Sequence, residues 1–278
     1  MVRRILNPLA LVPPVRDAHR RGNIVMIHIG RCGSTVLGNL LNQHPHITWD
    51  GEVYQDIFRE RQHADKSLPP IEDVDPARYL LHRSNRVFSR FYGFEVKFFH
   101  LRALGTNIDS YLEDLESLLG KMHFIVLERR NTLRVIVSTV AARRTGVWHL
   151  GESQARPADL VNVDVDAVFV NRKNDGLLDL LREFSRDFSD TEALLRNRSA
   201  LHLTYEDDIR RDPRAAYRKV CDFLDLPAVP VSTRFVPTNP APLHEIVENF
   251  DDIRSLLTGT EFEWMLETKR NPTSPIEK

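Results

Sequence analysis

A short stretch with two glycines has the residue types needed to bind a tetrahedral anion. Residues 30–35 read Gly-Arg-Cys-Gly-Ser-Thr and follow the apolar, β-branched run at 24–29. Apolar residues recur at helical spacing within residues 34–42, so the stretch joins an expected buried strand to an expected helix. Such a junction offers backbone N–H groups and the positive end of a helix to phosphate or sulfate. The residues expected to bind the anion are Arg31, Cys32, Gly33, Ser34 and Thr35.

A simpler interpretation is that the glycines only form a turn and that Ser34 only caps the helix. The stretch does not fit an ATP-binding loop, because a Walker A sequence has Lys directly before its Ser or Thr. Here Gly33 stands at that place, and the cation is Arg31. The run at 123–127 ends in Glu-Arg-Arg, where a kinase would have an Asp for magnesium. The sequence therefore favours an anion site of arginine and backbone amides, without a metal, over an ATP-dependent kinase.

A second pair of polar residues follows the strand expected at 123–127. Arg130 lies at the end of this strand, and Ser138 comes eight residues later in the helix expected at 132–144. Because the carboxyl ends of parallel strands face the same crevice, Arg130 and Ser138 could hold a second anionic group. The alternative is that Arg130 forms an ion pair with a nearby carboxylate and that Ser138 packs within its helix.

Together the two motifs resemble those of sulfotransferases that use 3′-phosphoadenosine 5′-phosphosulfate (PAPS), in particular bacterial carbohydrate and small-molecule sulfotransferases. The resemblance runs from residue 24 to 227 and implies that the first motif binds the 5′-phosphosulfate. It implies that Arg130 and Ser138 bind the 3′-phosphate. PAPS is then the co-substrate, 3′-phosphoadenosine 5′-phosphate (PAP) is the product, and no metal takes part. Two departures are Arg31, where the family often has lysine, and residues 269–271, which lack the glycine of the C-terminal Arg-Lys-Gly loop of cytosolic members.

The acceptor hydroxyl must lose a proton during transfer, which requires a base. Glu52 resembles the glutamate base of several bacterial members of the family, and we favour it. His100 is the rival, because it follows Lys97 at a strand end, as a catalytic histidine does in cytosolic members. The alternatives are that Glu52 is only a charge near a helix start and that His100 is a buried structural histidine. The expected catalytic residues are Glu52, Arg31, Lys97 and His100.

The resemblance implies an enzyme that moves the sulfuryl group of PAPS to a hydroxyl group of a carbohydrate or small-molecule acceptor. Two other functions stay open: a module that binds PAPS or PAP without turnover and, less favoured, a P-loop kinase. A binding module needs no base, so Glu52 and His100 argue for the enzyme. The identity of the acceptor and the oligomeric state stay open.

The composition excludes several classes of protein. The 278 residues carry a formal charge of −1, which lacks the basic excess of a general nucleic-acid-binding protein. Only seven of the 38 Lys and Arg residues are lysine; arginine suits phosphate and sulfate, although we attribute most of this bias to codon usage. Two distant cysteines support neither a disulfide framework nor a cysteine zinc site, and no apolar run is long enough to span a membrane. We expect a cytoplasmic protein.

The order of the strands and helices expected around these residues predicts an α/β fold. Short apolar runs that alternate with helical patterns are typical of a doubly wound, P-loop-like parallel sheet, here of about four or five strands flanked by helices. Strands are expected at 24–29, 94–99, 123–127 and 201–205, and helices at 34–42, 53–63, 76–90, 108–119, 132–144, 166–188, 213–224 and 244–257. Segments 53–92 and 146–200 are expected to form caps with helical insertions. We predict a single domain over 1–278, with an N-terminal extension at 1–22 and a C-terminal tail at 228–278 packed on it.

Overall fold

The computed structural model describes residues 18–63, 71–148, 150–151, 160–233, 235–236 and 241–267. The chain forms two compact units, one of Met1–Arg130 with Arg186–Arg234 and the other of Asn131–Ser185 with Phe235–Lys278. The expected single domain with a packed C-terminal tail stays a prediction, and most of the expected N-terminal extension lies outside the described residues.

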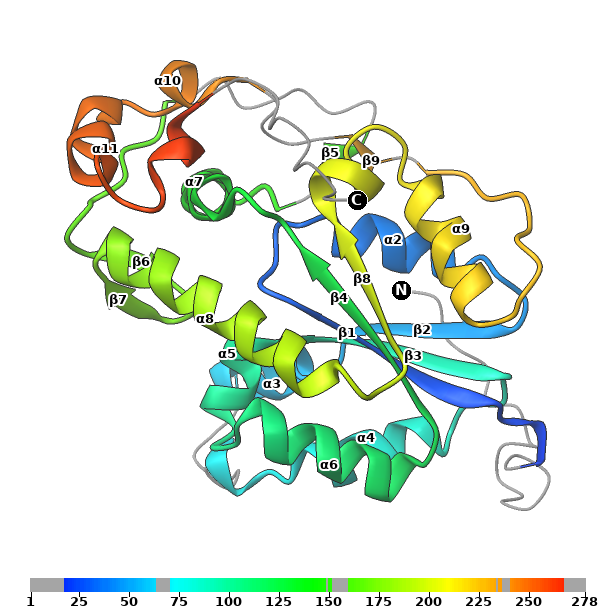
Figure 1. Ribbon diagram of the computed structural model, residues 1–278. Helices are drawn as coiled ribbons and strands as arrows, with labels where there is room; N and C mark the ends of the chain where they lie inside the picture. Colours follow the sequence, from blue (N-terminus) through cyan, green and yellow to red (C-terminus); the bar gives the residue numbers. More distant parts are fainter. Residues whose placement is uncertain are drawn as a thin grey trace. The chain divides into compact units, whose positions relative to one another are not determined.

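The first unit is built on a parallel sheet of five strands in the order β2-β3-β1-β4-β8 (Figure 1). The strands are β1 (Gly22–His28), β2 (Ile47–Glu52), β3 (Phe91–Lys97), β4 (Met122–Glu128) and β8 (Ala200–Thr204). β1 is central, because the chain adds β2 and β3 on one side of it and then β4 and β8 on the other. The predicted parallel α/β sheet is confirmed. In such folds, ligands bind at the carboxyl ends of the strands, at the point where the chain changes from one side of the sheet to the other. Here that point lies beside β1.

Helices cover both faces of this sheet. α2 and α9 pack together on one face, and α4 and α6 pack together on the other (Figure 1). The helical elements of this unit are α2 (Ser34–Leu41), α3 (Gln55–His63), η2 (Ile71–Asp73), α4 (Pro76–Ser84), α5 (Phe98–Ala103), α6 (Ile108–Leu119), η3 (Tyr205–Ile209) and α9 (Arg214–Phe223), with the end of α8 (Leu177–Leu195). Coverage on both faces explains why the central strands are apolar along nearly their whole length.

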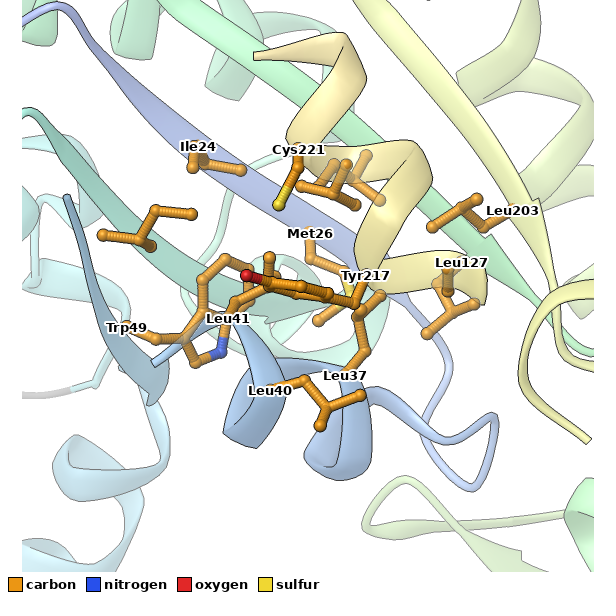
Figure 2. Packing of buried hydrophobic residues seen from close by; sticks show 14 of the residues in the cluster. Ile24, Met26, Leu37, Leu40, Leu41, Trp49, Leu127, Leu203, Tyr217 and Cys221 are labelled. Atoms are coloured by element: carbon orange, nitrogen blue, oxygen red, sulfur yellow. The ribbon is translucent and has the colours of Figure 1, made fainter. Parts of the chain in front are cut away.

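A continuous apolar core lies between the sheet and the pair α2 and α9 (Figure 2). Ile24 and Met26 of β1 face it together, because alternate residues of a strand point to the same side. Their buried partners are Leu37, Leu40, Leu41, Leu127, Leu203, Tyr217 and Cys221. Full burial of one such aliphatic side chain stabilises the fold by about 1.5–3 kcal/mol. The core therefore fixes α2, and with it the residues that precede α2, against β1.

The second unit is smaller and contains α7 (Thr132–Thr145) and the beginning of α8. Two short antiparallel pairs join β5 (Leu150–Gly151) to β9 (Phe235–Val236) and β6 (Val168–Val170) to β7 (Lys173–Asp175). The unit ends in α10 (Leu243–Ile246), α11 (Phe250–Leu257) and η4 (Glu263–Leu266). The side chain of Asn131 donates to the carbonyl of Met265 at 2.9 Å, and Arg134 donates to the carbonyl of Ala241 at 3.0 Å, which ties α7 to the C-terminal segment.

Several boundaries differ from the sequence expectations. The strand expected to reach residue 99 ends at Lys97, and α5 begins directly after it. The expected helix at 166–188 starts as the β6–β7 hairpin, because Asn171 and Arg172 adopt left-handed φ angles of 54° and 69° that turn the chain. The helix expected at 244–257 is divided into α10 and α11, and α4 ends at Ser84. Among the described residues, the helices are too short or too polar to cross a membrane.

Candidate active site

The β1–α2 loop, residues 29–33, has a backbone shape that few sequences can adopt. Gly30 and Gly33 have φ angles of 89° and 88°, and Arg31 has a φ of 53°. The left-handed region is accessible to glycine but costs energy for a residue with a side chain, and such outliers occur at functional sites. Gly33 occupies the N-cap of α2 and has no side chain with which to cap it. The amides of the first helical turn are thus available to an anion.

Gly33 is required for a second reason. A Cβ atom at this position would lie 2.6 Å from Cγ2 of Ile209, which belongs to η3 after β8. The side chain of Cys32 is fully buried in the apolar core, so Cys32 can serve an anion only through its backbone. The shape of the loop therefore has a steric basis, and the expectation that its residues bind an anion stays a prediction.

Two arginines concentrate positive charge at the loop. Nη1 of Arg129 donates to the carbonyl oxygen of Arg31 at 3.1 Å, and the Arg129 guanidinium lies over the Tyr205 ring at 4.4 Å. Burial, together with the neighbouring Arg129, lowers the pKa of Arg31 to about 10, and burial also lowers the pKa of Arg129. Both groups remain cationic at neutral pH. The buried Nε of Arg129 has no hydrogen-bond partner among the described residues, which fits a donor that an anionic ligand completes.

Glu52 and Lys97 meet beside this loop. Glu52 ends β2 and Lys97 ends the neighbouring strand β3, and Nζ of Lys97 lies 2.6 Å from Oε2 of Glu52. Both side chains are partly buried. A Cβ atom on Gly30 would lie 3.7 Å from the same Nζ, so the ammonium group adjoins the β1–α2 loop. The structure thus brings two of the expected catalytic residues, Glu52 and Lys97, together with the expected anion loop within the first unit.

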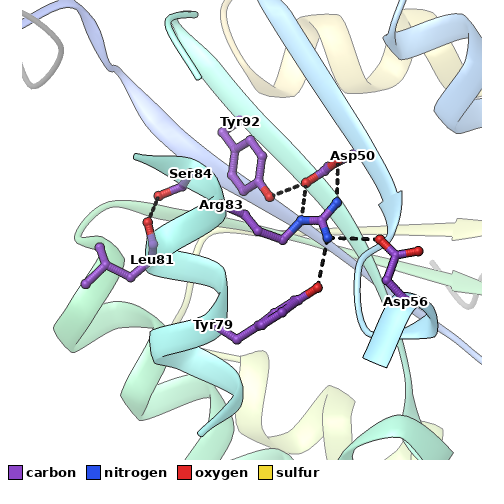
Figure 3. A network of polar contacts seen from close by, with 7 residues as sticks. All are labelled: Asp50, Asp56, Tyr79, Leu81, Arg83, Ser84 and Tyr92. Carbon is purple, nitrogen blue, oxygen red and sulfur yellow. Dashed lines mark hydrogen bonds and ion pairs between the residues drawn. The ribbon is translucent and has the colours of Figure 1, made fainter. Parts of the chain in front are cut away.

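The end of β2 is held in place by a network of charges (Figure 3). Arg83 of α4 donates to both carboxylate oxygens of Asp50, at 2.8 and 3.1 Å, and its Nη1 donates to Asp56 at 3.0 Å. The hydroxyl of Tyr92 donates to Asp50 at 2.7 Å. Two-point contacts between guanidinium and carboxylate fix both direction and distance. Asp50 is two residues before Glu52, so α4 fixes the strand end that carries the candidate base.

His100 lies inside α5 and is fully buried among Tyr54, Phe58 and Phe99. Its Nδ1 accepts a hydrogen bond from the backbone N–H of Lys97 at 3.3 Å. Burial, with the charge of Lys97, holds the pKa of His100 well below its usual range. The ring is therefore neutral, with its proton on Nε2, which has no hydrogen-bond partner among the described residues. A ring whose acceptor nitrogen is already occupied is a poor base in this arrangement.

Arg130 forms ion pairs at the end of β4. Its Nη2 lies 2.8 Å from Asp207, its Nε lies 3.8 Å from Glu206, and its backbone N–H donates to Glu206 at 3.1 Å. The sequence analysis names this pairing as the alternative to anion binding. Ser138 is buried in α7 of the second unit, so joint binding of one phosphate by Arg130 and Ser138 stays a prediction.

The region that contains all of these residues matches one family. Residues 24–230, from β1 to just beyond α9, match the sulfotransferase family. The chain belongs to this family. Sulfotransferases of known structure that resemble it include one from Alicyclobacillus acidocaldarius, with 13% identity over 89% of this chain and 94% of that chain and a TM-score of 0.48.

Two further solved structures resemble the present chain. The sulfotransferase domain from the curacin biosynthetic pathway is 15% identical over 76% of each chain, with a TM-score of 0.43. Retinol dehydratase in a complex with retinol and PAP is 14% identical over 76% of this chain and 62% of that chain, with a TM-score of 0.35. No curated protein matches this chain.

Sequence reasoning missed two buried residues of the sulfotransferase site and gave a third too little weight. His28 and Glu95 lie in β1 and β3, and Nε2 of His28 is 3.2 Å from Oε2 of Glu95. Arg129, which the sequence analysis considered only as part of the run Glu-Arg-Arg, holds the β1–α2 loop. The available signal was a histidine and a glutamate near the ends of otherwise apolar strands. Buried polar groups need partners, so such residues predict a partnered cluster.

Proposed function

We propose that this sulfotransferase moves the sulfuryl group of PAPS to a hydroxyl group of a carbohydrate or another small molecule. The observation that carries the proposal is the Glu52–Lys97 pair beside a β1–α2 loop with left-handed backbone and two arginines. An anion-binding loop alone would suit any phosphate ligand. A carboxylate next to it supplies the base that group transfer to a hydroxyl requires.

The proposed reaction is an in-line displacement at sulfur. The bond between the sulfur and the 5′-phosphate oxygen breaks, a bond from sulfur to the acceptor oxygen forms, and the acceptor proton moves to a carboxylate oxygen of Glu52. Negative charge grows on the phosphate of the departing PAP. Arg31, the amides of the β1–α2 loop and the Thr35 hydroxyl face that charge in our proposal, and loss of one such donor typically lowers the rate about a hundredfold or more.

Lys97 lies between the proposed base, Glu52, and the loop proposed to bind the phosphosulfate. Its ammonium group contacts the Glu52 carboxylate and adjoins Gly30 of the loop. We propose that Lys97 holds Glu52 in the direction of the acceptor and stabilises the sulfuryl oxygens during transfer. Positioning and charge stabilisation account for most of the catalysis in the related phosphoryl transfers, so a single cation at this place can have a large effect.

Glu52 is the proposed base and His100 is not. The Glu52 side chain is 28% exposed, so an acceptor can reach it, whereas His100 is fully buried and its Nδ1 accepts the Lys97 amide proton. His100 instead supports α5 and the end of β3. For the 3′-phosphate we keep Arg130 and Ser138 as proposed ligands, with Arg129 added for its unpartnered Nε. In this proposal Arg130 exchanges Asp207 for the phosphate.

Ligand-induced stabilisation tests the choice of donor. PAP at 100 times its dissociation constant is expected to raise the free energy of unfolding by about 2.7 kcal/mol, which thermal denaturation detects. ATP with magnesium is the matched control and is expected to give a smaller effect. Stabilisation by ATP with magnesium and none by PAP would reject a PAPS-dependent enzyme and favour a kinase.

Single-turnover transfer tests the base. Acceptors are first identified by transfer of radiolabelled sulfate from PAPS to a panel of sugars, lipids and phenols. With an accepted substrate, Glu52→Gln is expected to lower the rate of transfer by about a hundredfold or more while PAP affinity is kept. Glu60→Gln, a change of an exposed glutamate on α3, is the control. Full activity of Glu52→Gln would refute the assignment, and PAP binding without transfer to any acceptor would favour a binding module.

A further inference from the structure

A buried polar cluster contacts the β1–α2 loop on the side that faces the protein interior. Its members are His28, Ser34, Trp49 and Glu95, which come from β1, α2, β2 and β3, and all four are buried. A histidine and a carboxylate without exposure to water are costly unless each polar atom finds a partner. One partner of this cluster is the backbone of Gly30 in the β1–α2 loop, so the cluster can also determine the position of the loop.

His28 holds the beginning of the loop. The backbone N–H of Gly30 donates to Nδ1 of His28 at 3.0 Å. Although burial lowers it, Cys32 and Glu95 raise the pKa of His28 to about 10. An imidazolium, however, has no nitrogen that could accept the Gly30 N–H, so the geometry is that of the neutral ring with its proton on Nε2. That nitrogen is 3.2 Å from Oε2 of Glu95, a carboxylate that can only accept. This contact is close but not aligned as a hydrogen bond, so the Glu95 carboxylate acts through its charge: it favours a proton on Nε2, which is the tautomer that lets His28 accept from Gly30.

Glu95 also contacts the beginning of α2. It accepts a hydrogen bond from the side chain of Ser34, and its Oε1 accepts from the Trp49 indole at 2.8 Å. Although burial alone would raise it, the pKa of Glu95 is lowered by the contact with His28 and by hydrogen bonds from Trp49 and Ser34. Ser34 thus gives its only proton to Glu95 and presents lone pairs, not a donor, toward an anion. The hydroxyl donor expected at this helix start is then left to Thr35.

We propose that His28 is a positioning residue for the donor, acting through Gly30, with Glu95 as the group that sets its tautomer. This inference rests on the proposed function, because the β1–α2 loop is where PAPS is proposed to bind. His28 contacts the loop from the protein interior and, in this proposal, does not touch the ligand. Its hydrogen bond holds Gly30 at a φ of 89° and so directs the amides that follow.

Two substitutions of His28 separate its contacts with Gly30 and Glu95, and both also remove the imidazole from its third neighbour, Cys32. The side-chain oxygen of asparagine takes the place of Nδ1, and the side-chain nitrogen of glutamine takes the place of Nε2. His28→Asn therefore keeps an acceptor for Gly30 and loses the donor to Glu95, whereas His28→Gln keeps the donor and loses the acceptor. Trp49→Phe is the matched control, because it removes a partner of Glu95 and leaves the Gly30 bond intact.

The readouts are PAP affinity by calorimetry and amide hydrogen exchange of the segment 29–33. We expect His28→Gln to weaken PAP binding on the order of tenfold and to speed exchange in this segment. His28→Asn and Trp49→Phe are expected to stay within about threefold of the wild type in affinity, even where their melting temperatures fall. A purely structural role would instead make affinity follow stability in all three variants.

Equal affinity and equal exchange in His28→Gln and the wild type would overturn the inference. If the wild type does not bind PAP, the proposed function fails, and exchange of segment 29–33 in His28→Gln still decides the role of His28. Nitrogen NMR of the wild type gives a test that needs no variant. His28 must appear as the neutral tautomer with its proton on Nε2, and a proton on Nδ1 would refute the proposal.

Discussion

Lys97 has two neighbours with different roles in the proposed reaction: the carboxylate of Glu52, which is the proposed base, and Gly30 of the proposed anion loop. At the residue scale this makes it the most informative single position of the site. A lysine that only neutralised Glu52 would matter for stability. A lysine that also faces the transferred group matters for the rate, because its charge acts where charge develops.

Lys97→Met is therefore expected to lower the rate of single-turnover transfer by about a hundredfold, while the change in stability stays at about 1 kcal/mol, as for a partly exposed ion pair. Urea denaturation and transfer kinetics on the same preparations measure the two effects. Lys121→Met removes an exposed lysine and is expected to change neither. A rate for Lys97→Met within threefold of the wild type would exclude the catalytic role of Lys97.

His100 predicts a pH dependence of stability with a definite sign. Its pKa in the folded protein lies well below the usual value of 6.5, so below pH 6.5 the unfolded chain takes up a proton that the folded protein does not. The free energy of unfolding then falls as the pH decreases below about 6.5, by at most about 1.4 kcal/mol per pH unit from this residue. Above that pH it contributes nothing to the slope.

Urea denaturation at pH 7.5 and pH 5.5 checks this contribution. His100→Asn keeps an acceptor for the Lys97 amide and cannot titrate, so it is expected to lose about 1 kcal/mol less between these two pH values than the wild type. His82→Asn, on the exposed surface of α4, is the control. An identical loss in the wild type and His100→Asn would show that His100 is not a buried neutral histidine.

At the scale of elements, the β1–α2 loop depends on glycine in two distinct ways. Gly33 needs a left-handed backbone and also room for Ile209. Gly146, the C-cap of α7, has the same left-handed backbone, with a φ of 71° and a ψ of 0°, and a Cβ atom there would have no neighbouring atom within 4 Å. The two positions thus separate backbone strain from steric overlap.

Gly146→Ala is expected to destabilise the protein by about 1 kcal/mol, the cost of a left-handed alanine, without loss of PAP binding. Gly33→Ala adds a contact of 2.6 Å with Ile209, so we expect a loss of several kcal/mol, about 2–4, and loss of PAP binding. Thermal denaturation and calorimetry measure both. Equal effects of the two substitutions would contradict a close approach of η3 to the loop.

The sequence predicts elements well where one pattern runs without interruption. The expected helix at 108–119 coincides with α6, and the expected strands at 24–29 and 123–127 correspond to β1 and β4. The hairpin at 168–175 was missed because strands of three residues are too short for a period to be visible. His28 and Glu95 were missed because an apolar run conceals a polar residue whose partner lies in another strand, about seventy residues away.

At the scale of the whole molecule, a formal charge of −1 conceals a local excess of positive charge. Arg31, Arg129 and Lys97 all lie at the β1–α2 loop, while the remaining charges of the chain, 35 positive and 39 negative, sum to −4. A balanced surface avoids unspecific attraction to polyanions, and the local cations still attract a small anion with several charges. Net charge was therefore sufficient to disfavour nucleic acids as ligands and insufficient to predict the site.

The two cysteines report on opening of the folded molecule. Cys32 and Cys221 are the only cysteines of the chain, and both are free and fully buried. We expect neither to react with a thiol reagent on the scale of minutes in the native protein, and both to react in denaturant. PAP is expected to slow the labelling of Cys32, which lies in the β1–α2 loop, more than that of Cys221.

Mass spectrometry after timed labelling distinguishes the two thiols. Rapid labelling of Cys32 without PAP would mean that the loop opens locally, and equal protection of both thiols by PAP would mean that they become accessible only by global unfolding. Rapid labelling of Cys221 would contradict the packing of α9 against the sheet.

The neighbouring guanidinium groups of Arg31 and Arg129 have a practical consequence for the bench. Burial and, after it, the positive charge of Arg129 lower the pKa of Arg31 to about 10, so the two cations repel each other. Any inorganic anion that settles between them relieves this repulsion, whether or not it is related to the substrate. Phosphate and sulfate buffers should therefore preserve the purified enzyme during storage and at the same time compete with its donor in an assay. Activity is best sought in a buffer whose anions are large and singly charged.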